Sequence, residues 1–284
     1  MVAAPVLWST AGVVTRHMER AGAFEQVFWR SLFAFLFVLF VLILKANPWK
    51  AVRSAGRPGL VSGLMWAIMF TAFMFALAMT TTANALVVMS ISPLLTAVLA
   101  RIFLSDPVPP RTWIAAGAAA IGIGFMFGFS LEKHLLGMAV ALLIPFAAAI
   151  NVVVLRASAA KLDLVPAVML GGALSCLLAL AFSPAFSATP RDIALLAFLG
   201  CFQLGLPCTL LVIASRTLPA PEIALLGLLE VVLGPLWVWL GAGETPAAAT
   251  LVGGAVVLAA LALNELGGLG RERGGNRAGR PADP

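Results

Sequence analysis

The sequence is poor in charged residues, and this scarcity narrows the class of protein. Only 11% of the 284 residues are Asp, Glu, Lys or Arg, whereas about 25% are charged in an ordinary soluble domain. In addition, 62% of the residues are hydrophobic, and the mean hydropathy is +1.05 over the whole chain. These values leave no room for a sizeable soluble domain and predict a polytopic protein embedded in the lipid bilayer.

Cysteine and histidine are scarce as well. The three cysteines (Cys176, Cys201 and Cys208) fall in apolar segments without metal-ligand spacing, where cysteine behaves as a small hydrophobic residue. The two histidines, His17 and His134, fall in short connecting segments. We therefore expect neither a metal site nor a cofactor.

The motifs of intramembrane enzymes and of ATP-driven pumps are missing too. The chain has no HExxH, no GxSxG and no P-loop, and no histidine or pair of carboxylates lies deep in an apolar segment. An enzyme would need a nucleophile with its base, or a metal cluster, at that depth. We expect no catalytic residues, and a secondary transporter is favoured over an enzyme.

What the sequence does contain is a series of ten apolar runs, separated by charged breaks or by breaks rich in proline and glycine. A run of about 20 apolar residues crosses a bilayer as one helix. Because the connections are short, successive helices should be antiparallel neighbours. The sequence predicts an all-α membrane protein with ten transmembrane helices, of which the first is short for a straight span. The runs cover residues 3–16, 25–45, 58–80, 83–104, 112–130, 135–156, 164–183, 191–215, 221–243 and 247–266.

Lysine and arginine are distributed unevenly between the connections. If the N-terminus is cytoplasmic, most of the 18 Lys and Arg residues lie on the inner side, and the exceptions are Arg16, Arg20, Arg30, Lys133 and Arg191. By the positive-inside rule, both termini are then expected in the cytoplasm. The same bias explains the sequence pI near 10.0 without a nucleic-acid partner.

The two halves of the chain resemble each other. A shift that places Asp106 on Glu244 also places Ser92 on Glu230, and the order and lengths of the apolar runs agree across both halves. Because each half holds an odd number of helices, the second half must enter the membrane upside down. Inverted repeats are a transporter architecture, in which the substrate binds near the midplane and access alternates between the two sides. The predicted units are two inverted five-helix repeats, residues 1–134 and 135–266, and a disordered cytoplasmic tail, residues 267–284.

Three segments carry a family resemblance. They are VLWSTAGVVTR in the first run, SISPLLTAVLARIFLSD in the fourth and LLEVVLGPLWVWLGAGE in the ninth. Together with the ten runs and the repeat, they resemble the ten-helix EamA-type branch of the drug/metabolite transporter superfamily over residues 3–266. Two positions depart from the family pattern: Val231 takes the place of a usual proline, and Asp106 replaces the commoner glutamate.

Within that branch the chain is similar to bacterial inner-membrane exporters of aromatic and other neutral amino acids. The resemblance implies a secondary exporter of small amphipathic metabolites in the inner membrane, with a small-molecule substrate as its partner, and a monomer is compatible with it. An aromatic site with one carboxylate would suit a cation equally well, so a multidrug or quaternary-amine exporter is the alternative. An intramembrane enzyme is the less favoured class.

Glu230 is the only acidic residue deep inside one of the apolar runs. A charge at the centre of a membrane helix costs about 2.5–3.5 kcal/mol, so this side chain should face the bundle interior or a water-filled cavity. Three roles are open: a hydrogen bond to a neighbouring helix, reception of a substrate ammonium group, and proton exchange.

The residues expected on the same helical face as Glu230 are small or aromatic. Small residues let another helix or a ligand approach the backbone, and an aromatic ring provides an apolar wall. They are Gly227, Gly234, Trp237 and Gly241. The fourth run offers an equivalent face through Met89, Ser92 and Thr96.

The candidate site residues follow from these faces and from the aromatic and polar residues inside the runs. The candidate substrate-binding residues are Trp8, Trp66, Phe70, Ser92, Gln203, Glu230 and Trp237. The candidate packing or gating residues are Pro93, Pro145, Gly227, Gly234 and Pro235, because proline bends a helix and glycine permits close helix approach. Arg30 and Arg101 lie near the ends of their runs and are expected to snorkel to the membrane surface, with binding of a substrate carboxylate as the less favoured alternative.

Overall fold

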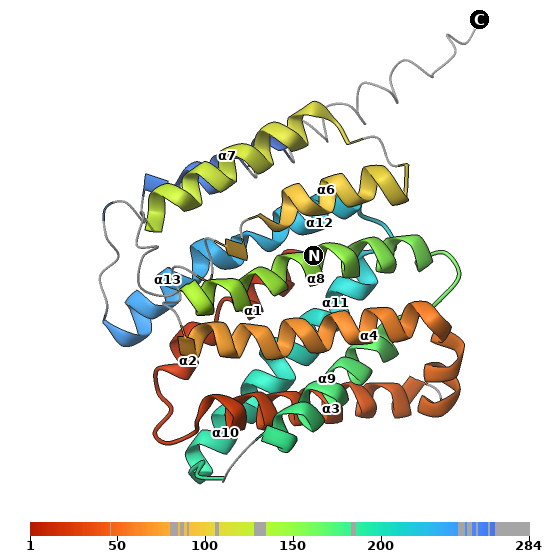
Figure 1. Cartoon of the computed structure of the whole chain (residues 1–284), viewed down its shortest axis with the longest axis vertical. Coiled ribbons are helices and arrows are strands. Elements are labelled where there is room, and N and C mark those ends of the chain that lie inside the picture. The colour runs from red at the N-terminus through yellow and green to blue at the C-terminus, as the bar shows by residue number, and fades with distance from the viewer. Residues whose placement is uncertain are drawn as a thin grey trace, which may run out of the picture.

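The computed structural model describes residues 1–45, 47–79, 85, 88–89, 91–105, 108–127, 135–182, 186–243, 248, 252–253, 255–260 and 262–264. The regular elements in these residues are all helices, which lie beside one another across Figure 1. The predicted tail, residues 267–284, lies outside the described residues, and so do Asp106 and Glu244.

The helices of the first half are α1 (Ala3–Trp8), α2 (Ala11–Thr15), α3 (Ala23–Lys45), α4 (Pro48–Met79), α6 (Ser92–Phe103) and α7 (Pro110–Phe127). Those of the second half are α8 (Leu135–Ser158), α9 (Val165–Phe182), α10 (Pro190–Phe198), the π-helix η2 (Leu199–Gly205), α11 (Leu206–Ala214), α12 (Ala220–Gly227) and α13 (Leu229–Ala242). The described residues between 252 and 264 are also helical.

Each of the ten predicted runs coincides with helical residues in the described part of the chain. Six helical segments are long and apolar enough to cross a membrane, and shorter apolar helices cover Ala3–Thr15, Ser92–Phe103 and Ala255–Asn264. The chain is thus an all-α, multi-pass membrane protein, as predicted. The inverted relation between residues 1–134 and 135–266 stays a prediction.

The first apolar run forms two short helices instead of one. α1 ends at Trp8 and α2 begins at Ala11. At the junction, the hydroxyl groups of Ser9 and Thr10 each donate a hydrogen bond of 2.7 Å to the carbonyl oxygen three residues earlier. Such bonds compete with the regular helical pattern. The first run, which is short for a straight span, is thus divided into two helices.

α4 starts earlier than the predicted run because it includes a short helix ahead of the span. At Gly56 the backbone adopts φ 54° and ψ −151°, a conformation that only glycine reaches at low cost. The chain turns there, two residues before Pro58, where the predicted run begins. In the short helix, the Arg53 guanidinium lies 5.8 Å from the centre of the exposed Trp49 ring.

Close backbone contacts hold α3, α4, α8 and α9 together. An added Cβ at Gly63 would lie 2.9 Å from the Cβ of Leu170, and one at Gly172 would lie 3.0 Å from the carbonyl oxygen of Ser31. In the same interface, the Ser31 hydroxyl donates to the Ser175 hydroxyl at 3.1 Å. Small residues and interhelical hydroxyl bonds are the usual means of packing helices in a membrane.

Gly171 provides a test of this packing. A Cβ at residue 171 would overlap the Cβ of Trp66 and lie 3.1 Å from the carbonyl oxygen of Gly63. Gly171→Ala should therefore lower the free energy of unfolding by about 1–3 kcal/mol. Gly117→Ala, in α7, is the matched control, because an added Cβ at residue 117 meets no atom within 4 Å. This variant should raise the free energy of unfolding by up to about 1 kcal/mol. Melting temperatures of the purified variants in detergent measure the difference, and equal values would contradict it.

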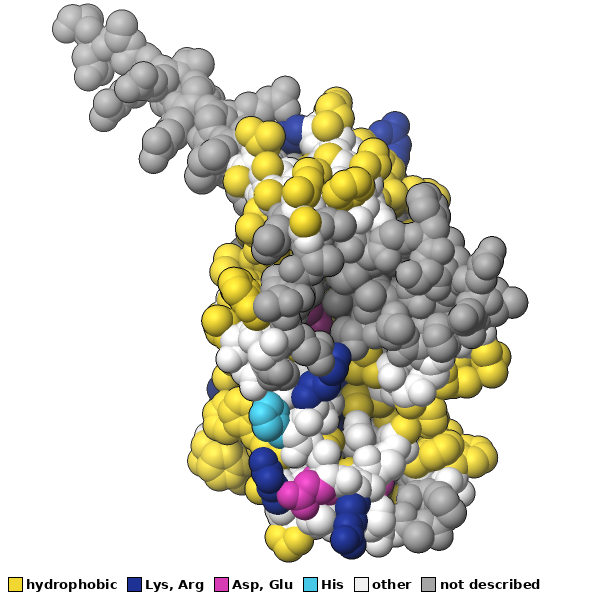
Figure 2. Space-filling model, turned by 90° about the vertical axis from the view of Figure 1, so that its left-hand side faces the viewer, with side chains coloured by type: hydrophobic (Ala, Val, Ile, Leu, Met, Phe, Trp, Pro, Cys, Tyr) yellow, Lys and Arg dark blue, Asp and Glu magenta, His cyan; other side chains and the backbone are white. Residues whose placement is uncertain are grey.

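Apolar side chains cover the flanks of the bundle, as expected where lipid surrounds it. Phe40, Ile114 and Leu177, from three different helices, expose more than half of their surface. In Figure 2, apolar side chains line both flanks of one face, whereas most of the charged side chains in view lie in the lower half and a few Lys or Arg side chains lie at the top. The chain thus presents lipid-facing sides and a charged end.

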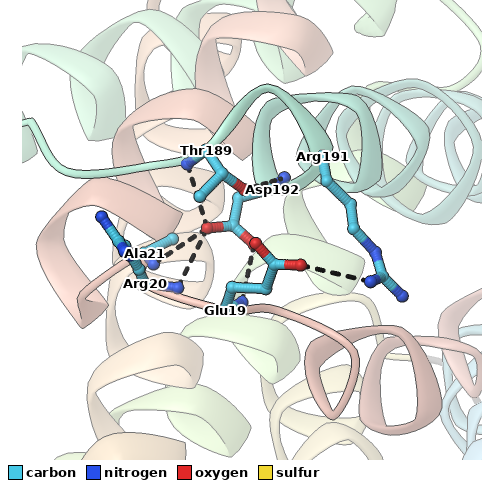
Figure 3. A network of polar contacts seen from close by, with 6 residues as sticks. All are labelled: Glu19, Arg20, Ala21, Thr189, Arg191 and Asp192. Carbon is cyan, nitrogen blue, oxygen red and sulfur yellow. Dashed lines mark hydrogen bonds and ion pairs between the residues drawn. The ribbon is translucent and has the colours of Figure 1, made fainter.

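Asp192 fastens the connection between α2 and α3 to the start of α10 (Figure 3). Its carboxylate is fully buried and accepts hydrogen bonds from the backbone N–H groups of Glu19 at 2.8 Å, Arg20 at 3.0 Å and Ala21 at 3.2 Å. It also accepts from the N–H of Thr189 at 3.2 Å, while the Thr189 hydroxyl accepts from the N–H of Asp192. This reciprocal pair is a capping box, so one side chain both starts a helix and anchors a distant connection.

Glu25, in the first turn of α3, makes the complementary connection. Its buried carboxylate accepts hydrogen bonds from the backbone N–H groups of Ser187 at 3.0 Å and Ala188 at 2.8 Å, and from the Ser187 hydroxyl at 3.1 Å. We call Glu25 and Asp192 together the carboxylate clamp. The clamp joins residues 162 or more positions apart in the sequence, and it joins the two halves of the chain at one end of the bundle.

Candidate functional site

Three of the predicted spans contain irregular backbone. The first is interrupted between α1 and α2, and the eighth contains the π-helix η2. The ninth is interrupted at Leu228, where the N–H of Leu228 bonds to Leu225 O and the N–H of Val231 bonds to Leu228 O, both at a spacing of three residues. Irregular backbone at membrane depth is tolerated where it lines a cavity or is buried in protein, and interrupted helices often mark binding sites.

A cavity of about 160 Å³ lies beside these irregular segments. Since one water needs about 10–15 Å³ by this measure, the cavity has room for roughly ten waters, or for a ligand of similar size. Its wall contains residues from both halves of the chain. The aromatic lining residues are Trp8, Trp66, Phe70 and Phe73, and the charged or polar ones are Arg30, Ser92, Asn151, Gln203 and Glu230.

The cavity brings together six of the seven predicted substrate-binding residues, which the sequence separates by up to 222 positions. They are Trp8, Trp66, Phe70, Ser92, Gln203 and Glu230. Met89, expected on the same face as Ser92, also lines the cavity. Their role in binding stays a prediction, but their positions agree with it.

Trp237 is the predicted binding residue that does not line the cavity. Its indole Nε1 donates a hydrogen bond of 2.8 Å to the Ser9 hydroxyl. Trp237 therefore fastens α13 to the junction between α1 and α2, and it supports the wall from outside.

The glycines of the ninth span do not act as one packing face. An added Cβ at Gly227 meets no atom within 4 Å, and Gly227 lines the cavity instead. At Gly234 the nearest atom would be Ser9 O at 4.0 Å, so this glycine is not tightly packed either. The close approach lies at Gly241, where an added Cβ would come within 2.5 Å of the Val13 side chain.

Pro93 and Pro145, two of the predicted proline gates, are not among the lining residues of the cavity, although their neighbours Ser92 and Ile144 are. Pro93 is buried in the first turn of α6, and Pro145 is buried inside α8, which stays helical on both sides of it. Pro235 falls inside α13, but its side chain lies outside the described part of the structure. A gating role for these prolines stays a prediction.

Arg30 does not snorkel to the membrane surface, which corrects the expectation from sequence. Its side chain is 1% exposed and lines the cavity. One terminal N–H group donates to the carbonyl oxygen of Phe70 at 2.8 Å, and the guanidinium lies 5.7 Å from the centre of the Phe73 ring. These contacts with α4 hold the charge inside the bundle, where it faces the same space as Glu230.

Glu230 lies in the first turn of α13, directly after the interruption at Leu228. The hypothesis of a structural hydrogen bond requires a partner on a neighbouring helix, and none exists among the residues that the structure describes. The exposed N–H groups at a helix start favour a negative charge nearby. The carboxylate thus lines the cavity and has no hydrogen bond to the residues that the structure describes, so a ligand or water can bind its oxygens.

Several other buried polar atoms in the cavity wall lack a hydrogen-bond partner in the described structure. They are Nε of Arg30, Nε1 of Trp66, Nδ2 of Asn151 and Oε1 of Gln203. The remaining polar atoms of the two amides are bonded: Oδ1 of Asn151 accepts from the Ser62 hydroxyl at 2.6 Å, and Nε2 of Gln203 donates to Trp8 O at 3.2 Å. Buried polar groups are rarely left without a hydrogen bond, so these atoms are available to bind a polar ligand or water in the cavity.

Asn151 and Cys208 line the cavity but were not expected there. Asn151 did leave a signal, since it is an uncharged polar residue in the middle of the run 135–156. Cys208 left none, because a buried cysteine cannot be told from any other small apolar residue in such a run.

Comparison with known proteins gives a family match for the first half of the chain and a similar fold for nearly the whole chain. Residues 1–128 match the EamA-like transporter family. A crystal structure of another protein is 18% identical to this chain and superimposes with a TM-score of 0.80, covering 93% of this chain and 94% of its own. No curated protein matches the chain. The first half therefore has the sequence pattern of an EamA-like transporter, and the fold of the whole chain recurs in a solved structure.

Proposed function

We propose that this chain is a secondary transporter of the EamA-like kind, which exports small amphipathic metabolites, foremost neutral and aromatic amino acids. The match over residues 1–128 and the multi-pass helical fold support a transporter. Its proposed location is the inner membrane of a bacterium, with both termini in the cytoplasm, and the distribution of lysine and arginine supports that orientation.

The observation that carries this proposal is the cavity. Its aromatic wall suits an apolar side chain, whereas Arg30 and Glu230 offer one positive and one negative group to the same guest. Its volume suits a molecule of about a dozen non-hydrogen atoms. A neutral amino acid with an aromatic side chain has this size and both charges.

Alternating access between two inverted repeats is the proposed mechanism. The cavity draws its wall from residues 1–134 and from residues 135–266, and interrupted helices in both halves border it. Both features are typical of transporters whose halves rock around a central site. Pro93, Pro145 and Gly227 are proposed to let the bordering helices bend.

The alternative is an exporter of multidrug-type or quaternary amines. Glu230 and the rings of Trp8, Trp66 and Phe70 in one cavity favour it, because an aromatic cage attracts a cation. Arg30 counts against this alternative, because its buried positive charge repels a cationic ligand that has no negative group of its own.

Counterflow in liposomes tests the proposal. Purified protein should exchange external radiolabelled phenylalanine, tryptophan or leucine for internal unlabelled amino acid, and the label should emerge chemically unaltered. The rate should exceed that of protein-free liposomes, and an excess of unlabelled amino acid outside should suppress it. Exchange of quaternary amines alone would favour the alternative, and chemically altered label would indicate an enzyme.

A further inference from the structure

One wall of the cavity is built around a single face of α4. Ser62, Trp66 and Phe70 follow each other at four-residue spacing, so they share this face. The Ser62 hydroxyl holds Asn151 at one end, and the carbonyl oxygen of Phe70 holds Arg30 at the other. Asn151 and Arg30 are therefore bonded to α4 one turn before and one turn after Trp66, and we call these three lining residues the donor strip.

This strip offers hydrogen-bond donors without acceptors. Nε of Arg30, Nε1 of Trp66 and Nδ2 of Asn151 are buried and have no partner in the described structure. The three side chains are only 1%, 4% and 1% exposed. A buried donor without an acceptor destabilises a protein, and the guanidinium also carries a charge. An anionic group bound at Arg30 would compensate its charge and offer an acceptor to the donors within its reach.

The acceptors of the cavity come from other helices. Glu230 belongs to α13, and Oε1 of Gln203, in η2, has no hydrogen-bond partner among the described residues. No ion pair joins Arg30 to Glu230 or to another acidic side chain among the described residues. The two charges thus face one cavity without meeting, which leaves a space that a zwitterion can bridge.

We infer that Arg30 receives the carboxylate of the transported molecule, with Trp66 and Asn151 as its neutral partners. The inference rests on the proposed transport through this cavity and deepens it. Arg30 then decides which amphipathic molecules are accepted: a free carboxylate is required, and an amine without one is disfavoured. A guanidinium suits this task because its N–H groups match the geometry of a carboxylate.

The test compares phenylalanine with phenethylamine, which differs from it by lacking the carboxylate. The affinities of both ligands are measured by equilibrium binding of radiolabelled compound to the full-length purified protein. The wild type should bind phenylalanine roughly ten- to a hundred-fold more tightly than the amine, as expected for a buried charge-assisted hydrogen bond. Arg30→Gln should abolish this preference by weakening phenylalanine binding while leaving amine binding unchanged or improved.

Two further variants keep the test decisive. Trp66→Phe removes one N–H group but keeps an aromatic ring, so it should reduce the preference for phenylalanine over the amine, by less than Arg30→Gln does. Arg53→Gln removes an arginine outside the cavity and should change neither affinity. If Arg30→Gln fails to fold, two measurements still test the carboxylate role of Arg30: the ligand preference of the wild type, and the reduction of that preference in Trp66→Phe.

The outcomes separate the inference from the proposed function. A wild type that binds the amine as well as phenylalanine, or an Arg30→Gln variant that loses both ligands equally while it stays folded, overturns the carboxylate role and leaves transport standing. A wild type that binds neither ligand and exchanges no amino acid in liposomes overturns both.

Discussion

Glu230→Gln is expected to weaken binding of an ammonium-bearing substrate roughly ten- to a hundred-fold. The carboxylate faces the cavity and has no hydrogen bond within the described structure, so its charge is free for the guest. A charge-assisted hydrogen bond in a buried site contributes about 1.5–3 kcal/mol, which corresponds to this range. Glutamine keeps the shape and removes the charge. The change should therefore appear in the dissociation constant, with little change in melting temperature.

The measurement is equilibrium binding of phenylalanine, followed by counterflow with and without a pH gradient. Glu222→Gln is the matched control, because Glu222 lies in α12, outside the cavity lining, and faces Arg111 at 3.8 Å. It should leave the affinity unaltered. If Glu230→Gln keeps its affinity and its counterflow but no longer responds to a pH gradient, the carboxylate carries protons. A folded variant with normal binding and normal pH response would show that neither role applies.

Asp192→Ala should destabilise the protein by about 3–5 kcal/mol. The substitution removes the common acceptor of four backbone N–H groups, and each buried donor left without a partner costs about 1–3 kcal/mol unless water reaches it. The connection between α2 and α3 would then detach from the start of α10. Melting temperature in detergent is the first readout, and proteolysis of the connection between residues 16 and 22 is the second.

Glu19→Gln is the control for the clamp. Glu19 pairs with Arg191 at 3.2 Å beside Asp192, but both side chains are about half exposed. An exposed ion pair contributes at most about 1 kcal/mol, so this variant should melt close to the wild type. Similar melting temperatures for Asp192→Ala and the wild type would mean that water replaces the carboxylate at little cost.

The positions of the helices could be predicted because lipid imposes a simple rule on the sequence. Every span needs an apolar run, and the runs were separated by visible breaks. The third run was predicted from Pro58 in this way, whereas α4 begins ten residues earlier and turns at Gly56. The cost of a buried charge likewise pointed to Glu230, since an acidic residue at that depth needs a cavity or a partner.

What could not be predicted depends on contacts between helices or on local changes of helix geometry. Arg30 lies near the end of its run, and only the carbonyl oxygen of Phe70, on another helix, explains why its side chain turns inward. Trp237 was placed on the face of Glu230 by assuming one regular helix. Both residues do lie in α13, but Trp237 is seven residues further along the helix, where its indole bonds to the Ser9 hydroxyl instead of reaching the cavity.

The attachments of the first span also have a consequence for biosynthesis. Ala3–Thr15 is too short to cross a membrane as a regular helix, and its contacts reach far along the chain: Trp8 O accepts from Gln203, and the Ser9 hydroxyl accepts from Trp237. A ribosome makes residue 237 long after residue 15, so the N-terminal segment must wait, inserted but unattached, until most of the protein has been synthesised. The beginning of this chain is therefore among the last parts to reach its final place.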